Sequence, residues 1–192
     1  MNKVEELIDL LRDEDRRWDA ILQLKCLDYP ELSSELEPYL EDSEWIIRWC
    51  VAERLGEIGD GNSIDPLIKC LSDPDRHVQK NAVNALKKYS LLAIPALIHR
   101  FNDPNRIMRS KCQDVCIECG KEVIPELEKA LESENWIRSN RIIHTIWMIG
   151  GKGAEISLIN SLKYEKVQKT LIALLGKMKS EEAIFSLIES YK

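Results

Sequence analysis

Three cysteines lie at a spacing where thiolates could hold a metal ion. Cys112, Cys116 and Cys119 form the pattern C-x3-C-x2-C, which would place them on one face of a helix at successive turns. The residues 30 positions earlier include the apolar Ala82 and Leu86. Buried free cysteine commonly packs as a small apolar side chain. We therefore interpret the three thiols as part of a helix core and expect no metal.

Other residues that often carry catalysis are scattered along the chain. His77, His99 and His144 are followed by Val, Arg and Thr, and they have no adjacent carboxylate to complete a metal site. The chain contains no Gly-rich phosphate loop, Gly-x-Ser-x-Gly elbow or H-E-x-x-H motif. We expect a protein without enzymatic activity or cofactor.

The elements that must position these side chains repeat about every 30 residues. Equivalent apolar residues step by 31, 30 and 30 positions: Leu40, Leu71, Phe101 and Leu131. Residues at the expected ends of the longer helices step by the same amounts: Gly59, Ser90, Gly120 and Gly150. Each unit has the apolar spacing of a short helix, then a turn rich in Asp, Asn, Ser and Pro, then a longer helix.

Weaker copies extend this pattern to both ends of the chain. Residues 14–27 and 165–178 are predicted to be long helices, and Val4 to Leu11 a first short helix. A last short helix is predicted from Ala183, Ile184, Leu187, Ile188 and Tyr191. The sequence therefore predicts seven short helices enclosing six long ones, in a single domain over residues 1–192.

The composition agrees with an all-α, water-soluble chain. Of the 192 residues, 44% are hydrophobic and 31% charged, and only 8 Gly and 7 Pro interrupt the helix-forming residues. The first eleven residues are acidic rather than a basic secretion signal, and the chain has no apolar run long enough to cross a membrane. We expect a cytoplasmic protein whose six cysteines are free thiols.

The repeated pattern resembles HEAT repeats, in particular the phycobilisome-lyase-like subgroup. The residues that carry it are, in the best copy, Asp42, Trp45, Ile47, Arg48, Gly59, Asp60, Ile64, Pro66 and Leu67. The resemblance implies a right-handed α-α superhelix of about six helical hairpins, with long helices lining a concave face. The HEAT-like enzyme deoxyhypusine hydroxylase takes its iron ligands from His-Glu dipeptides, and this chain has none.

Arginines recur near the start of the long helices. Arg48 and Arg109 occupy the position that HEAT-like repeats often give to arginine, with Gln79 as the substitute between them and Arg138 displaced by one residue. Aspartates recur in the preceding turns: Asp42, Asp73 and Asp103. We expect these arginines to bond those turns and to have a structural role.

Five tryptophans stand on the predicted long helices. Trp45 and Trp136 match the family tryptophan, and Trp18 is aligned with the apolar Ile47, so we expect all three in the core. For Trp49 and Trp147 the equivalent residues are largely polar, which predicts exposed side chains. An exposed tryptophan is a common binding anchor.

Charge separates between the two kinds of helix. The short-helix segments have a net charge of -14 and the long-helix segments +8, within a chain of net charge -6. A basic concave face would attract an acidic partner. The predicted partner-binding residues are Trp49, Glu53, Lys80, Asn84, Lys87, Asp114, Asn140, Arg141, His144 and Trp147.

These observations favour a scaffold or adaptor that binds another protein with an acidic surface or peptide, with a monomer favoured. Nucleic-acid binding, as in the HEAT-like alkylpurine DNA glycosylases, is an alternative. A bilin lyase or lyase chaperone is another, which the resemblance to the subgroup implies. Cofactors and membranes are not expected.

Overall fold

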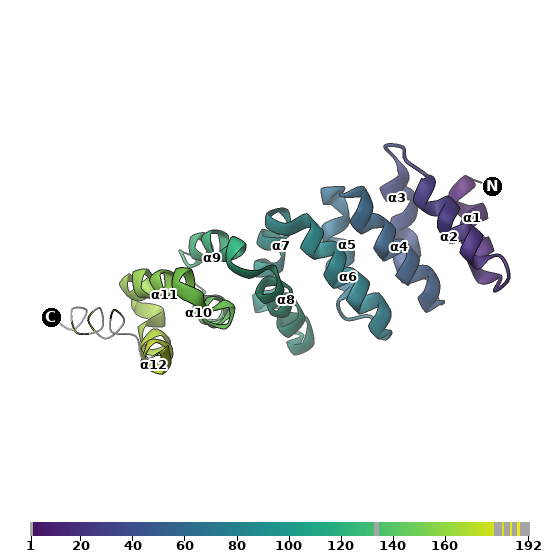
Figure 1. The fold of residues 1–192 in the computed structure, drawn as a ribbon. Coiled ribbons are helices and arrows are strands. Elements are labelled where there is room, and N and C mark those ends of the chain that lie inside the picture. Colours follow the sequence, from purple (N-terminus) through teal and green to yellow (C-terminus); the bar gives the residue numbers. More distant parts are fainter. Residues whose placement is uncertain (1, 133–134, 179–181, 183–184, 186–187, 189–192) are drawn as a thin grey trace. The chain divides into compact units, whose positions relative to one another are not determined.

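The computed structural model describes residues 2–132, 135–178, 182, 185 and 188. Over these residues the chain is built from helices without strands (Figure 1), which confirms the all-α prediction. The shorter elements are α1 (Lys3–Arg12), α3 (Leu32–Leu36) with the 3₁₀-helix η1 (Glu37–Glu41), α5 (Ile64–Cys70), α7 (Ile94–His99), α9 (Ile124–Ala130) and α11 (Gly151–Asn160). The long helices are α2 (Arg17–Cys26), α4 (Trp45–Ile58), α6 (Arg76–Tyr89), α8 (Arg106–Cys119), α10 (Trp136–Ile149) and α12 (Gln168–Met178).

The helices alternate as the repeat predicted, and short 3₁₀ turns connect them. These turns are η2 (Gly61–Ser63), η3 (Ser90–Leu92), η4 (Arg100–Asn102), η5 (Gly120–Val123), η6 (Ser161–Lys163) and η7 (Glu165–Val167). The predicted last short helix, with Ala183, Ile184, Leu187 and Tyr191, falls largely outside the described residues. None of the described helices is long and apolar enough to cross a membrane.

Contacts within the chain divide it into two compact units, Met1–Ala93 and Ile94–Lys192. In the first unit, long helix α4 packs against α2 and α6, and α5 packs against η1. In the second unit, α10 packs against α8 and α12, and α9 packs against α7 and α11. Each unit therefore has a layer of long helices and a layer of short ones.

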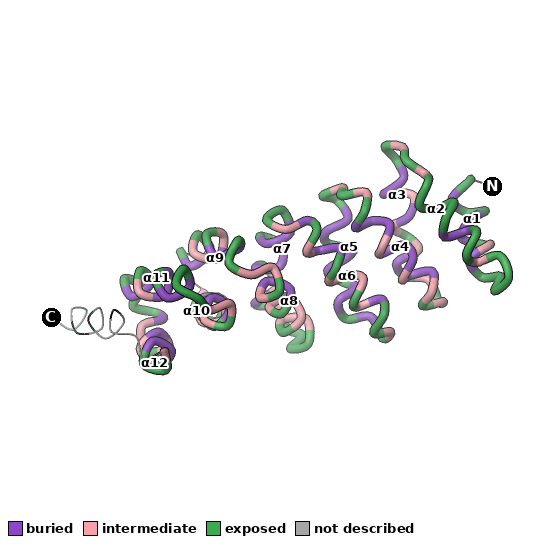
Figure 2. Tube along the Cα trace, in the orientation of Figure 1, coloured by how far each residue is buried: buried purple, intermediate pink, exposed green. Residues whose placement is uncertain are grey.

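The core of each unit lies between these two layers. Each helix buries one side and exposes the other, as the alternating colours along every helix of Figure 2 show. Cys112 and Cys116 of α8 are fully buried, as predicted, and Cys119 is half-buried. Burial raises the pKa of the Cys112 thiol to about 12, so this thiol stays protonated at neutral pH. No group of His, Cys, Asp or Glu among the described residues could hold a metal ion.

The helix ends follow the predicted repeat. Gly59, Gly120 and Gly150 end long helices with φ values of 75°, 75° and 71°, in the left-handed region that suits glycine. Ser90 takes the equivalent place at the end of α6 with φ 46°, which is unfavourable for a residue with a side chain. The backbone at this position of the repeat therefore has a positive φ even where the residue is not glycine.

The recurrent arginines make the predicted hydrogen bonds to the turns that precede their helices. Arg48 donates from Nη1 to the backbone oxygen of Asp42 at 2.7 Å, and from Nε and Nη2 to the Asp73 carboxylate at 2.7 and 2.9 Å. Arg109 Nη1 and Gln79 Nε2 likewise donate to the backbone oxygens six residues earlier, at 2.6 and 2.7 Å. Arg48 thus links the turn before its own helix to the turn before the next long helix.

The same bond reveals the register of the first repeat. Arg17 Nε donates to the backbone oxygen of Leu11, again six residues earlier, at 2.8 Å. Arg17 is therefore equivalent to Arg48, 31 residues later, and Trp18 is equivalent to Trp49. The predicted alignment of Trp18 with Ile47 was wrong by two positions.

The prediction that three tryptophans lie in the core was also wrong. Trp18, Trp45 and Trp136 expose 71%, 45% and 63% of their surface. Trp45 and Trp136 are the first residues of their helices, where a side chain is not yet covered by a preceding turn. Trp18 lies on the exposed side of α2, whose buried residues are Ala20, Ile21 and Leu24.

Candidate functional site

Two grooves run between neighbouring long helices, one in each unit. The α4–α6 groove, of about 430 Å³, is lined by Glu53, Asn81, Asn84, Ala85, Lys87 and Lys88. The α8–α10 groove, of about 460 Å³, is lined by Gln113, Asp114, Ile117, Trp136, Ile137, Asn140, Arg141, His144 and Met148. Most of the partner-binding residues predicted from the sequence line one or other of these grooves.

In the first unit, the predicted residues Glu53, Asn84 and Lys87 line the α4–α6 groove, whereas Lys80 is exposed outside it. Trp49 is half-buried rather than exposed, and its backbone oxygen accepts a bond of 3.2 Å from Asn81. The predicted anchor is therefore less exposed than the sequence indicated.

Most of the residues that line the α4–α6 groove are of polar or charged type, and its carboxylate is already paired. Glu53 Oε2 lies 3.3 Å from Lys25 Nζ of α2. Ala85 of α6 lines this groove, and Gly56 of α4 meets it so closely that a Cβ on the glycine would stand 2.4 Å from the Cβ of Ala85. This groove has no large exposed apolar side chain on its lining.

In the second unit, Asp114, Asn140, Arg141 and His144 all line the α8–α10 groove, so the structure brings four predicted residues together. Trp147 is half-buried and does not line it. Its ring meets that of His144 edge-on, with 6.5 Å between centroids. Lys177 Nζ lies 5.8 Å from the Trp147 ring centroid on the side of α12.

Arg141 is the cation on the lining of this groove. Its Nη1 donates to Gln113 Oε1 at 2.6 Å, and its Nε is buried without a hydrogen-bond partner. No carboxylate pairs with it in the part of the chain that the structure describes, unlike Arg48 with Asp73. Burial and the nearby positive charge of Arg109 lower the pKa of Arg141. Arg141 is thus a partly desolvated cation that lacks an anion.

Asp114 and His144 occupy equivalent positions, 30 residues apart, on α8 and α10. Partial burial raises the pKa of the Asp114 carboxyl, with the nearby Lys111 acting in the opposite direction. Burial lowers the pKa of His144, and the positive charges of Lys177 and Arg141 lower it further. His144 is therefore neutral at pH 7, and the charges on the lining are those of Arg141 and Asp114.

The α8–α10 groove also has large exposed apolar residues that the sequence interpretation missed. Trp136, Ile137 and Met148 expose 63%, 44% and 55% of their surface, and Ile117 is half-buried beside them. A signal for two of them was present in the repeat. The residues equivalent to Trp136 are Trp45, Arg76 and Arg106, and those equivalent to Met148 are Glu57, Lys88 and Glu118. Charged equivalents indicate surface positions.

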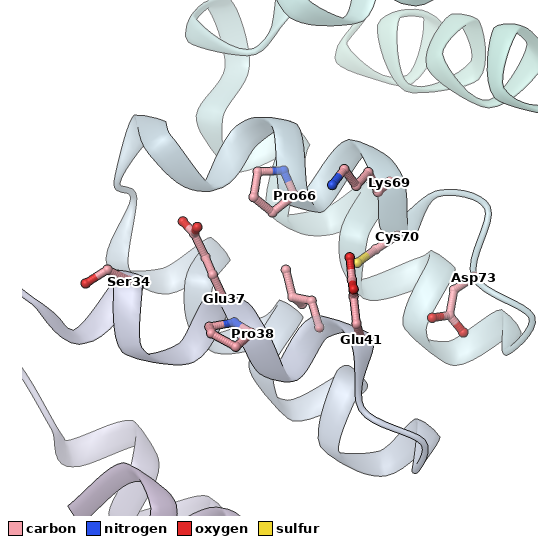
Figure 3. A pocket seen from close by; sticks show the side chains of 9 residues that line it. Ser34, Glu37, Pro38, Glu41, Pro66, Lys69, Cys70 and Asp73 are labelled. Carbon is pink, nitrogen blue, oxygen red and sulfur yellow. The ribbon is translucent and has the colours of Figure 1, made fainter. Parts of the chain in front are cut away.

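A third cleft, of about 560 Å³, lies on the short-helix side between η1 and α5 (Figure 3). Glu37 and Glu41 point from η1 toward α5, which presents Pro66, Lys69 and Cys70. The Asp73 carboxylate at its edge is held by Arg48, and burial raises the pKa of the Cys70 thiol to about 12. None of the predicted site residues lines this cleft.

Solved structures with a similar fold span several activities. Human deoxyhypusine hydroxylase in complex with glycerol is 19% identical, with a TM-score of 0.46 over 96% of this chain and 75% of that one. The complex of CpcE and CpcF of phycocyanin lyase from Nostoc sp. PCC7120 is 19% identical, with a TM-score of 0.46 over 97% of this chain and 80% of that one. A designed armadillo repeat protein in complex with the peptide (KR)4 is 16% identical, with a TM-score of 0.39 over the full length of both chains. No curated protein sequence matches this chain.

Part of the amino-acid sequence matches a known protein family. Residues 55–116 match the family described as HEAT repeats. This segment includes α5, α6 and α7 and most of α8. The same hairpin, with its 30-residue step and its side-chain bond to the turn before each long helix, recurs on both sides of the matched segment. Residues 55–116 are therefore similar to HEAT repeats, and the described residues on both sides of them repeat the same helical hairpin.

Proposed function

We propose that this protein is a non-enzymatic binding module that recognises another protein, and that the α8–α10 groove is its contact site. One observation carries the proposal. Trp136 and Met148 are exposed in the groove at positions that α6 and α8 fill with charged residues. The hairpin does not need an apolar side chain at these positions, and clustered exposed apolar residues mark interaction sites.

The groove has the features of an interface centre. Trp and Arg are the residues that most often dominate binding energy, and Trp136 and Arg141 lie on the same lining. Exposed basic residues on the neighbouring long helix of the same unit, such as Lys169 of α12, would favour the approach of an acidic partner. These features support an adaptor or scaffold role.

A protein partner is favoured over a nucleic acid by the charge of this groove. Arg141 is the only Lys or Arg among the described residues that line it, and Asp114 lies on the same lining. Nucleic-acid binding requires several cations to neutralise successive phosphates. The absence of catalytic activity is part of the proposal, supported by thiols whose pKa burial raises to about 12, such as Cys70 and Cys112.

Site-specific photo-crosslinking tests this proposal. A benzophenone amino acid replaces Ile137, which is 44% exposed in the groove, or Ile156 of α11, which is 47% exposed on the short-helix layer. The two isoleucines are matched in type and exposure. Illumination in an extract of the source cells is expected to give discrete protein adducts from position 137 and few from position 156.

The adducts from position 137 should also disappear when Trp136→Ala is added and should survive nuclease treatment. Equal adduct patterns from both positions would refute the assignment of the site. Adducts that nuclease removes would replace the protein partner with a nucleic acid.

A further inference from the structure

We propose that the α8–α10 groove binds an extended peptide segment with one acidic side chain between two large apolar side chains. The acidic side chain pairs with Arg141, and the apolar ones contact Trp136 with Ile137 on one side and Met148 on the other. This inference rests on the proposed function and specifies the chemistry of the partner.

The need for an anion follows from the surroundings of Arg141. Its guanidinium has a neutral partner, Gln113, and a buried Nε without a partner. The two arginines that are buried among the described residues each have a carboxylate within reach: Arg48 pairs with Asp73, and Arg54 Nη1 lies 3.4 Å from Glu57 Oε2. A carboxylate brought by a ligand would supply the charge-assisted bond that Arg141 lacks.

The ligand should carry one negative charge at this point rather than a run of them. Asp114 lines the same groove, is exposed, and has no hydrogen bond or ion pair with another described residue. Its carboxylate would repel a second acidic group that entered the groove. His144 is neutral at pH 7 and offers no second positive charge. The groove therefore favours an isolated acidic residue.

The apolar residues lie on both sides of Arg141 along α10. Trp136 precedes Arg141 by five positions and Met148 follows it by seven, so their Cα levels along the helix axis differ from that of Arg141 by about 7.5 Å and about 10.5 Å. An extended chain advances about 3.3 Å per residue. The fitting segment has the pattern apolar-x-acidic-x-x-apolar when it runs parallel to α10, or the reverse pattern when antiparallel.

The same arrangement selects a side-chain carboxylate over a chain terminus. A terminal carboxylate at Arg141 would leave either Trp136 or Met148 uncovered, because the chain would end between them. A continuous segment covers both. The partner is thus an internal stretch of a polypeptide, and its recognition combines apolar burial with one ion pair.

Synthetic peptides test this chemistry. The probes are fluorescein-labelled Gly-Leu-Ser-Glu-Ser-Ser-Leu-Gly and the reversed order Gly-Leu-Ser-Ser-Glu-Ser-Leu-Gly, both acetylated and amidated so that no terminal charge remains. Fluorescence anisotropy with the full chain is expected to show saturable binding of at least one. Replacement of its Glu by Gln should weaken binding about tenfold, and replacement of both Leu by Ser should weaken it at least as much.

Variants of the protein locate the binding. Arg141→Gln should remove the difference between the Glu and Gln peptides, while Trp136→Ala should weaken both. Lys121→Gln, an exposed residue in η5 away from the groove lining, should leave all affinities unchanged. If Arg141→Gln unfolds by circular dichroism, the comparison of Glu and Gln peptides on the wild-type protein still decides the matter.

The outcomes separate this inference from the proposed function. Equal binding of the Glu and Gln peptides, or no binding of any of these peptides, would overturn the inference, and crosslinks from position 137 would still support a protein partner with other chemistry. A further peptide ends at the acidic position with a free main-chain carboxyl group instead of the Glu side chain. Tighter binding of this truncated peptide would transfer the ion pair to a chain terminus and would also overturn the inference.

Discussion

Arg48 and Arg141 show how the same residue type serves structure at one position and is available for binding at another. Arg48 is only 8% exposed, and all three of its guanidinium nitrogens donate hydrogen bonds, to the Asp73 carboxylate and to the backbone oxygens of Asp42 and Ser43. Arg141 has one neutral partner. The number of internal partners therefore separates a structural arginine from a candidate contact.

Replacement of Asp73 should lower the stability of the protein, because the Asp73 carboxylate pairs with the buried Arg48. Asp73→Ala would leave the Arg48 charge buried without its carboxylate, and we expect the free energy of unfolding to fall by about 3 kcal/mol. Urea denaturation followed by circular dichroism measures this. The double variant Arg48→Met, Asp73→Leu should recover much of the loss, because it removes both charges. A single variant as stable as the wild type would contradict the structural role.

His144 should make stability depend on pH. The nearby cations are Lys177 of α12 and Arg141 of the same helix α10, and Asp114 of α8 lines the same groove. Burial and the two cations hold its pKa below the ordinary 6.5. As pH falls through about 6.5, the unfolded chain takes up a proton more readily than the native one, so the free energy of unfolding decreases.

His144→Gln removes this contribution. Between pH 7.5 and 5 the variant should lose less of its free energy of unfolding than the wild type, as measured by urea denaturation at each pH. His99→Gln, an exposed histidine at the end of α7, controls for the loss of a histidine elsewhere. Equal acid sensitivity of His144→Gln and wild type would show that His144 is not held in its neutral form.

At the scale of elements, a glycine allows two long helices to pack closely. Gly56 of α4 is buried against Ala85 of α6, where an added Cβ would lie 2.4 Å from the Cβ and 2.8 Å from the Cα of Ala85. Such distances cannot be accommodated without moving one helix. The packing of α4 on α6, and with it the width of the α4–α6 groove, therefore depends on the missing side chain.

Two glycine-to-alanine substitutions test this packing. Alanine favours helix over glycine by up to about 1 kcal/mol, and Gly176→Ala in α12, with open space around the glycine, should be stabilising by such an amount. Gly56→Ala should instead be destabilising by about 1–3 kcal/mol, because overpacking outweighs the gain in propensity. Thermal unfolding of both variants gives the comparison. Stabilisation by Gly56→Ala would show that the helices separate without cost.

The helical hairpins were predictable because the repeat spacing and the capping residues are local signals. The predicted buried positions of Cys112 and Cys116 follow from the same periodicity. Exposure at the helix starts was not predicted, because Trp136 was assigned to the core as a family residue although Arg76 and Arg106 stand at its equivalent positions. The convergence of Asp114 and Arg141 on one groove was predicted in outline. That Arg141 lacks a carboxylate partner depends on individual side-chain contacts, which a periodic sequence pattern does not predict.

At the scale of the whole molecule, the repeat architecture determines how far a local change spreads. In a chain of stacked repeats each hairpin contacts mainly its neighbours, so stability is approximately a sum of local terms. Contacts here group into the units Met1–Ala93 and Ile94–Lys192. The sequence alone predicted a single domain. In a single cooperative domain, a substitution that destabilises one unit also destabilises the other. In two units that open separately, its effect stays mainly within one unit.

Core truncations in each unit distinguish them. Leu55 of α4 and Leu127 of α9 are both fully buried, so replacement by alanine should cost about 2–5 kcal/mol in either case. If the units open separately, Leu55→Ala will speed hydrogen exchange mainly in α1 to α6, and Leu127→Ala mainly in α7 to α12, as measured by mass spectrometry. We expect this reciprocal pattern. A uniform rise in exchange along the chain for both variants would instead mean that all the repeats unfold as one cooperative domain.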